Sequence, residues 1–581
     1  MKKLLLSILT AILLLSSILL ISCGDGVTTT TADVTTTTTE KARTTPAFQI
    51  VNFKGLKTSL EFEVTENDPD NVGAITKIEL YKDGVRVKTA ENTDIRKFSN
   101  LTSSTKYTVK VTYSYDLQNG EGEKTEVASV DITTTDGFSS KTTVKRDWSG
   151  KTLNIACSTW SAEPSAPWSV IELCVDYGKE SGFGTKIDAS VLERQEFIKE
   201  TYGVELNWIN ATRWGMHDAL KTAELAGNIN YDLALPRQMR AQSIVSNGSV
   251  YDLKDREYLD FDNSYYSQAS VEAYTAKGHT FFVDGDFSTI NKETAKVLFF
   301  NKTLLGGEQA TADLYRKVRE GKWTWSELVT LASAAHKDDG DGVIGDTDIY
   351  GLKLNLNFLY YYFDTKQAGV DEATGEWKIT LNDGRSDDIV TAIIHAKTSN
   401  WCITGWEGSW GLNAQALING WLLFYNSIIR ESFLALYNNN IGVVPFPMLN
   451  EEQSRYCVPL SLETIIICIP KITQDRQMSE YFLDVLTWTG NDYVTNAYFE
   501  QKAEQLGNDE DMEMLKSYIF PNIVYDAGEY VGWGDLIGSV LGESYQGNVN
   551  RFDEAYAKYE PEALETVAKW NEAWGAYTEE K

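Results

Sequence analysis

Polar side chains that directly follow apolar, strand-like runs are the residues of this sequence best suited to hold a ligand. Open α/β sheets bind ligands beyond the carboxyl ends of their strands, so side chains at such positions are expected to lie together. Guanidinium, carboxamide and hydroxyl groups can hydrogen-bond to a hydroxylated ligand, and an aromatic ring can cover its apolar face. The positions are Trp160 after NIACST, Arg237 and Gln238 after YDLALP, and Asn426 and Ser427 after WLLFY.

Aromatic side chains form a second candidate set, since the 581 residues include 16 Trp and 30 Tyr. A flat ring offers an apolar platform and loses little side-chain entropy on binding. Core packing is the alternative interpretation for each of these rings. The candidates are Trp406 and Trp410 in the Gly-rich stretch WCITGWEGSWG, Trp533 in GEYVGWGDL, and the pair Tyr265-Tyr266.

Residues for covalent or zinc-dependent catalysis are sparse. Only four His occur, none with a paired metal spacing, and the sequence has no GxSxG, P-loop or GxGxxG motif. The Cys residues after Cys23 form no CxxC spacing, so neither a disulfide framework nor a zinc site is indicated. The sequence has 83 acidic residues, which supply many candidates for the carboxylate pair of a glycoside hydrolase but select none. Zinc hydrolysis and His-based triads therefore lack obvious candidates, and a surface glycoside hydrolase is the enzymatic alternative that the sequence leaves open.

An acidic, Gly-rich stretch, KDDGDGVIGDTD at residues 337–348, resembles the calcium loop of EF-hands and dockerins. Asp339, Asp341 and Asp348 would be its ligands, at the third, fifth and twelfth loop positions. Lys337 stands at the first position, and the twelfth lacks the usual bidentate Glu. Ca²⁺ is therefore the one cofactor that the sequence suggests, and a solvated acidic turn is the alternative.

Residues 1–22 have the pattern of a signal peptide, with two Lys before a long apolar run. Ser22-Cys23 then resembles the lipobox of bacterial lipoproteins, in which cleavage leaves the cysteine to carry lipid. A transmembrane helix is the alternative, because the run nearly reaches the ~20 residues that a bilayer needs. Residues 23–46 are rich in Thr and predict an extended linker. We expect a chain tethered by lipid to the extracellular face of the cell membrane, and its net charge of −30 argues against a nucleic-acid partner.

Residues 47–136 alternate apolar and polar side chains, which is typical of the short strands of a β-sandwich. Asp83-Gly84 stands between two alternating runs and predicts a type I′ hairpin. The stretch LTSSTKY, which ends at Tyr107, resembles the tyrosine corner of fibronectin type III domains, although no Trp precedes Trp148. We expect a fibronectin type III- or immunoglobulin-like spacer, with glycan binding as an alternative role. Residues 137–150 are polar and punctuated by Gly, and predict a second linker.

Residues 151–581 alternate strand-like and helical patterns, which predicts α/β architecture with mainly parallel sheets. A segment of this length is expected to form two lobes rather than one. The clearest patterns are strands at 152–158 and 204–209 and helices at 192–202, 325–335 and 479–488.

From about residue 149 to the C-terminus, the sequence resembles the family 1 extracellular solute-binding lipoproteins of bacterial ABC importers, in their carbohydrate-binding branch. The resemblance implies a two-lobed periplasmic-binding-protein fold, a monomer that closes by hinge motion on an oligosaccharide, and delivery to an ABC permease without covalent chemistry. Members often carry a Trp pair where this chain has Tyr265-Tyr266, and a glycan-adhesion lipoprotein without a transporter is a further alternative. The matching stretches are, in order, NIACSTW, DASVLERQEFIKETYGVEL, NYDLALP, VYDLKDREYLDFDNSYY, VLFFNKTLL, GKWTWSELVTLA, ALINGWLLFYN, IGVVPFPMLNEEQSRY and ICIPKITQD.

Overall fold

The structure is a computed structural model, and it describes the chain from residue 43 to residue 578 with internal gaps. The predicted signal peptide and Cys23 lie outside the described residues. No helix in the described part of the chain is long and apolar enough to span a bilayer. The described ranges are 43–55, 60–90, 93–94, 96–98, 101–102, 105–134, 140–143, 145–158, 185–211, 215–227, 230–340, 347–404, 410–430, 435, 440–461, 464–526 and 536–578.

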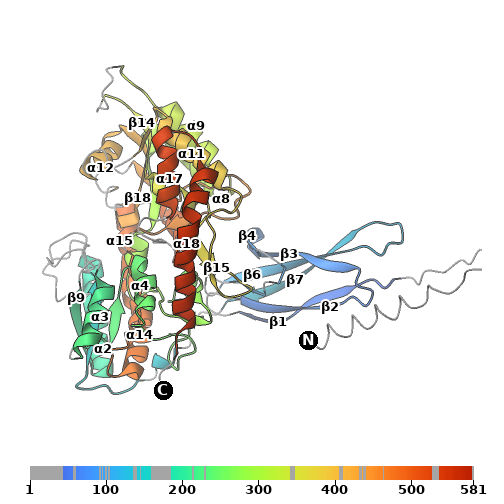
Figure 1. Ribbon diagram of the computed structural model, residues 1–581. Coiled ribbons are helices and arrows are strands. Elements are labelled where there is room, and N and C mark those ends of the chain that lie inside the picture. Colours follow the sequence, from blue (N-terminus) through green and yellow to red (C-terminus); the bar gives the residue numbers. More distant parts are fainter. Residues whose placement is uncertain are drawn as a thin grey trace, which may run out of the picture.

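A small all-β domain comes first and lies beside the rest of the molecule (Figure 1). One sheet has the order β1-β2-β5 and the other the order β4-β3-β6-β7. Alternate side chains of β6, including Tyr107, Val109 and Val111, are buried in the core between the sheets, as the period of two requires. The strands are β1 (Ala47–Gly55), β2 (Leu60–Asn67), β3 (Gly73–Lys82), β4 (Val85–Thr89), β5 (Lys97–Phe98), β6 (Lys106–Tyr115) and β7 (Lys124–Thr133).

Two local predictions for this domain are confirmed. Asp83 and Gly84 join β3 to β4 with φ values of 50° and 82°, the positive values that a type I′ turn requires. The Tyr107 hydroxyl accepts a hydrogen bond from the Thr102 backbone N–H at 2.9 Å. That is the contact by which a tyrosine corner holds the chain before its strand.

The described part of the segment expected to be a second linker packs against the first lobe. Its short helix η1 (Lys141–Thr143) lies on α14 (Arg476–Thr489), and Asp484 of α14 accepts hydrogen bonds from the hydroxyls of Ser140 and Thr142, both at 2.5 Å. Lys97 of the all-β domain is also paired with Asp262 at 2.7 Å. The all-β domain is therefore attached to the first lobe by side-chain contacts as well as by the chain.

The first lobe is built on a parallel sheet in the order β10-β8-β9, with helices packed around it. The predicted helix 192–202 lies within α2, and the predicted helix 479–488 lies within α14. Residues 464–470 return to this lobe and lie antiparallel to β10. The elements are β8 (Thr152–Ser158), α2 (Thr185–Tyr202), β9 (Glu205–Ala211), α3 (Met216–Ala226), β10 (Leu233–Leu235), α4 (Ala241–Ser246), α5 (Gln268–Ala273), α6 (Ile290–Glu293), α14, a π-helical turn (Gly490–Thr495) and α15 (Asn496–Leu506).

The second lobe is built on a five-stranded sheet in the order β17-β14-β18-β13-β19. This sheet is mixed, not mainly parallel, because β13 enters it from the first lobe and runs antiparallel to both β18 and β19. The predicted helix 325–335 is α9. The elements are β13 (Lys296–Asn301), α7 (Lys302–Leu305), α8 (Glu308–Arg319), α9 (Trp325–Ala335), β14 (Tyr350–Leu354), α10 (Leu359–Tyr362), β15 (Ala368–Val370), β16 (Trp377–Ile379), α11 (Ser386–Thr398), β17 (Cys402–Thr404), α12 (Trp410–Asn419), β18 (Leu422–Ile428), β19 (Ile441–Val444), α16 (Asp509–Glu513) and α17 (Leu536–Gly547).

Segments near the boundary join the two lobes. Residues 294–296 lead from α6 into β13. Residues 457–461 lead back toward the first lobe, where the described chain resumes at Thr464, and they include β20 (Val458–Pro459), which pairs with β21 (Ile523–Val524). The long helix α18 (Phe552–Gly575) runs along both lobes (Figure 1), and Trp574 near its end donates to Gln242 of α4 at 2.9 Å. The predicted fold class, a small all-β domain followed by two α/β lobes, is confirmed.

Candidate functional site

Arg237 and Gln238 lie at the carboxyl edge of the first lobe's sheet, as predicted. They come directly after β10 and Pro236, and both side chains are buried. Arg237 forms a backbone bridge with Ile465, and the Gln238 N–H donates to the Thr464 carbonyl at 3.0 Å. The segment that returns from the second lobe therefore passes directly beside these two residues.

Asn426 and Ser427 are placed differently from the prediction, because β18 continues to Ile428 and includes them. Asn426 Nδ2 donates to the Tyr362 hydroxyl at 2.7 Å and to the Val297 carbonyl at 3.1 Å, so it serves the interior of the second lobe. The strand continues because Ser427, a small residue, and Ile428, a β-branched one, extend the run WLLFYN. The polar residue that stands beyond the end of β18 is Arg430.

Arg430 belongs to a buried ionic group that sequence reasoning missed. Glu293 at the end of α6 forms two ion pairs. Its Oε1 lies 2.6 Å from Lys502 Nζ, and its Oε2 lies 3.5 Å from Arg430 Nε. Glu293 and Lys502 belong to helices of the first lobe, and Arg430 follows β18 of the second lobe. A buried charge is tolerated when it is paired. Extending the predicted strand by three residues, to Ile428, would have placed Arg430 just beyond its end, but nothing local indicates the partners of Arg430.

Short hydrogen bonds connect the two sheet edges through the crossing segments. The hydroxyls of Thr464 and Thr294 are hydrogen-bonded at 2.6 Å, and the Ser461 N–H donates to the Thr294 carbonyl at 3.0 Å. On the other side, the Ile429 N–H donates to the Ala295 carbonyl at 2.9 Å. We call this region the interlobe edge; it comprises Arg237, Gln238, Glu293, Thr294, Arg430 and Thr464.

An aromatic residue stands at the same edge of the second lobe. Phe358 follows the carboxyl end of β14, and Lys296 begins β13 at that edge. The Lys296 ammonium lies 3.9 Å from the centre of the Phe358 ring, a cation–π contact. The half-buried Phe358 is therefore an aromatic residue beside the start of β13, and the sequence analysis did not select it.

Tyr265 and Tyr266 lie in the core of the first lobe rather than at the interlobe edge, with 1% and 2% of their surface exposed. Both hydroxyls donate to Asp484 Oδ1 at 2.8 Å. Burial, together with this neighbouring carboxylate, holds the pKa of both phenols above its usual range. In this structure the pair supports α14 and offers no ring face to a ligand.

The tryptophan candidates fall largely outside the described residues. Trp160, Trp406 and Trp533 are among the undescribed positions, and Trp410 is the first residue of α12. Their binding role stays a prediction from the sequence.

The acidic loop brings together Asp339 and Asp348, as predicted, and adds Asp338. One acceptor oxygen from each of the three lies within 4.8 Å of the others, whereas Asp341 is outside the described residues. Asp348 also accepts from the Asp339 N–H and the Tyr350 hydroxyl, both at 3.1 Å. Carboxylate oxygens at this spacing suit Ca²⁺, so the calcium prediction stands as a proposal.

Ca²⁺ is expected to raise the melting temperature of the chelator-treated protein. A free concentration tenfold above Kd corresponds to about 1.4 kcal/mol of stabilisation. Asp338→Asn, which changes an exposed ligand, should lower the affinity for Ca²⁺ in calorimetry, while Asp313→Asn on α8 should not. Equal melting temperatures with and without Ca²⁺ would rule the ion out and leave a solvated turn.

Comparison with known proteins gave structural likenesses only. No protein-family model matches the sequence, and no curated protein matches it. The solved structures that align include the GacH receptor of Streptomyces glaucescens GLA.O, crystallised unliganded and with acarbose (14% identity, 74% of this chain and 100% of that chain, TM-score 0.44). Others are a cyclo/maltodextrin-binding protein with maltotetraose (13%, 73% and 98%, 0.48) and the sugar-binding protein MalE of Xanthomonas citri (13%, 74% and 100%, 0.48). At these identities and TM-scores the likenesses transfer neither a ligand nor a function to this chain.

Proposed function

We propose that this chain is an extracellular receptor that captures a carbohydrate, an oligosaccharide in our expectation, between its two lobes and delivers it to an ABC permease. The chain would close on its ligand by hinge motion and would perform no covalent chemistry. The resemblance of its sequence to carbohydrate-binding solute-binding lipoproteins and its two-lobed fold both support this function.

The interlobe edge is the observation that carries the proposal. Arg237 and Gln238 of the first lobe lie beside the crossing segment at Thr464, and Arg430 beyond β18 of the second lobe pairs with Glu293 just before the other. The hydrogen bond between the Thr294 and Thr464 hydroxyls joins the two segments. Side chains from both lobes can then contact one ligand, and hinge motion in the crossing segments would let the lobes rotate about their junction. Guanidinium and carboxamide groups are suited to the vicinal hydroxyls of a sugar.

Tethering is the second part of the proposal. Lipid on Cys23 would hold the receptor at the membrane near its permease, and the Thr-rich segment and the all-β domain would set its reach. The sheet orders β1-β2-β5 and β4-β3-β6-β7, with the Tyr107 contact, support a fibronectin type III-like spacer. We expect a monomer.

A thermal-shift screen across mono- and oligosaccharides, polyols and peptides tests the proposed ligand class. A cognate oligosaccharide at 100-fold its Kd is expected to stabilise the protein by about 2.7 kcal/mol, which raises the melting temperature by a few degrees. Stabilisation by peptides alone would assign a different ligand class. Release of shorter sugars during incubation would replace the receptor by the glycoside hydrolase alternative.

A further inference from the structure

Two neighbouring residues just after β21 form hydrogen bonds to different lobes. The Tyr525 hydroxyl donates to Asp284 Oδ2 of the first lobe at 2.6 Å. Asp526 Oδ2 accepts from the Gln367 N–H of the second lobe at 3.1 Å. One peptide bond therefore separates an anchor in one lobe from an anchor in the other.

Each anchor is buried and fixed within its own lobe. The Asp284 carboxylate also accepts from the Gly285 N–H at 2.7 Å, and the Asp284 N–H donates to Ser270 of α5 at 2.8 Å. Gln367 donates to the Tyr361 hydroxyl at 2.9 Å and accepts from the Ile537 N–H of α17 at 3.0 Å. A rotation of one lobe against the other must strain or break one of the two anchors.

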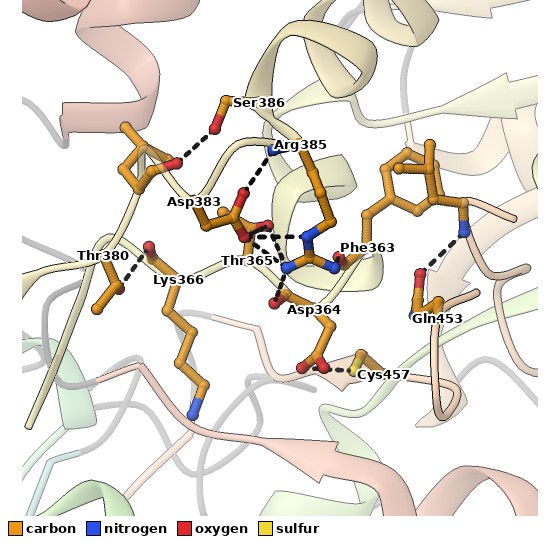
Figure 2. A network of polar contacts seen from close by, with 12 residues as sticks. Phe363, Asp364, Thr365, Lys366, Thr380, Asp383, Arg385, Ser386, Gln453 and Cys457 are labelled. Atoms are coloured by element: carbon orange, nitrogen blue, oxygen red, sulfur yellow. Dashed lines mark hydrogen bonds and ion pairs between the residues drawn. The ribbon is translucent and has the colours of Figure 1, made fainter. Parts of the chain in front are cut away.

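The strand that pairs with β21 is tied to the second lobe (Figure 2). Arg385 donates to the carbonyls of Phe363 and Asp364 at 2.9 and 2.8 Å, and so holds the Asp364 backbone in its left-handed conformation, with φ at 59°. Asp364 Oδ1 then accepts from the Cys457 thiol at 3.1 Å, directly before β20 (Figure 2). The same oxygen accepts from Arg455 at 3.3 Å. β20 and β21 therefore move with the second lobe, and Tyr525 reaches from it to the first.

Tyr525 also supports the interlobe edge. Its ring packs edge-on against that of Tyr274, with centroids 6.1 Å apart. The Tyr274 hydroxyl in turn donates to Gln238 Oε1 at 3.3 Å. Displacing Tyr525 would therefore disturb the side chain of a candidate ligand residue that it does not touch.

We propose that Tyr525 and Asp526 form a pivot between the lobes, in which the Tyr525–Asp284 hydrogen bond sets the population of the interlobe arrangement and Tyr525 positions Gln238. Only the expected effect of the pivot on ligand affinity rests on the proposed function. The pivot itself is a property of the ligand-free chain.

The pivot has an expected pH dependence. Burial raises the pKa of Asp284 to about 7, and the other charged groups that act on it are Lys292 and Asp286, themselves paired at 2.6 Å. A carboxylate accepts a stronger hydrogen bond from a phenol than a protonated carboxyl does, so the anchor weakens as the pH falls through 7. Global stability changes in the opposite sense. The folded-state pKa lies above the ~3.9 of an unfolded Asp, so the Asp284 contribution is complete below pH ~4 and is lost between pH ~4 and ~7.

Pulsed EPR distances between the lobes of the ligand-free full chain test the pivot. Spin labels at Leu225→Cys of α3 and Lys322→Cys after α8 report one position in each lobe, both exposed. Tyr525→Phe is expected to broaden the distance distribution by at least twofold. The matched control is Tyr315→Phe, which removes an equally buried Tyr–Asp hydrogen bond of 2.6 Å, to Asp511, within the second lobe. It should lower the melting temperature similarly and leave the distribution unchanged.

The same labels test the pH dependence. The parent distribution should broaden from pH 8 to pH 6, and Asp284→Asn should make it independent of pH. A Tyr525→Phe distribution equal to the parent one, or equal broadening by Tyr315→Phe, would overturn the pivot. Because no sugar is present, a failed ligand screen leaves this result standing and a failed pivot leaves the receptor function standing.

Discussion

Asp484→Ala is expected to lower the free energy of unfolding by about 4 kcal/mol. The Asp484 carboxylate is buried and accepts from four hydroxyls, those of Ser140, Thr142, Tyr265 and Tyr266. Removing it leaves several buried donors without their acceptor, each at a cost of about 1–3 kcal/mol before the hydroxyls find other partners. Calorimetric unfolding of the variant measures the loss.

Single Tyr→Phe variants separate the loss of hydrogen bonds from the loss of the Asp484 side-chain volume. Tyr265→Phe and Tyr266→Phe each remove one donor and are expected to cost about 1 kcal/mol. Asp313→Ala, an exposed Asp on α8, is the control for loss of a carboxylate and should change little. A parent-like melting temperature for Asp484→Ala would show that the carboxylate is not the organising group of this core.

Asp484→Ala should also release the all-β domain from the first lobe. Ser140 and Thr142 belong to the segment between the two, and Trp488 and Tyr481 of α14 hold Thr142 as well. Limited proteolysis within residues 140–150 is expected to become several-fold faster in the variant, because cleavage follows the population of the open form. Unchanged cleavage would mean that the remaining contacts suffice to hold the segment.

Arg237→Ala is expected to weaken binding of the sugar identified in the screen by about 100-fold. Two hydrogen bonds from a charged donor are worth about 3 kcal/mol together, and 1.4 kcal/mol corresponds to tenfold in Kd. Calorimetric titration measures Kd directly. Arg237→Lys keeps the charge but not the planar fork of donors, so it should recover only part of the affinity.

Arg319→Ala is the matched control, since Arg319 is an Arg of the outer helix α8 that pairs with Glu510 and Glu513. It should leave Kd unchanged. If Arg237→Ala binds the sugar with the parent Kd while remaining folded, the ligand site lies away from the interlobe edge.

Local patterns determined those features of the fold that depend on near neighbours in the chain. The alternation of residues 47–136 predicted the all-β domain, and Asp83-Gly84 predicted its hairpin, because side-chain period and backbone freedom are local properties. Helix α9 coincides with its predicted range for the same reason. The apolar run before Arg237 placed that residue at the end of a strand.

The tertiary structure alone decided which side chains from distant parts of the chain contact one another. Tyr265 and Tyr266 are buried because Asp484, more than 200 residues later in the chain, accepts their hydroxyls. Glu293 pairs with Lys502 and Arg430, and Tyr525 bonds to Asp284, across more than 130 residues of chain in each case. A buried carboxylate is stable only where donors converge on it, and that convergence depends on how the lobes fold around it. The sequence by itself therefore determined which elements form and where β10 ends, whereas packing between distant elements decided which polar side chains support the core and which lie at the interlobe edge.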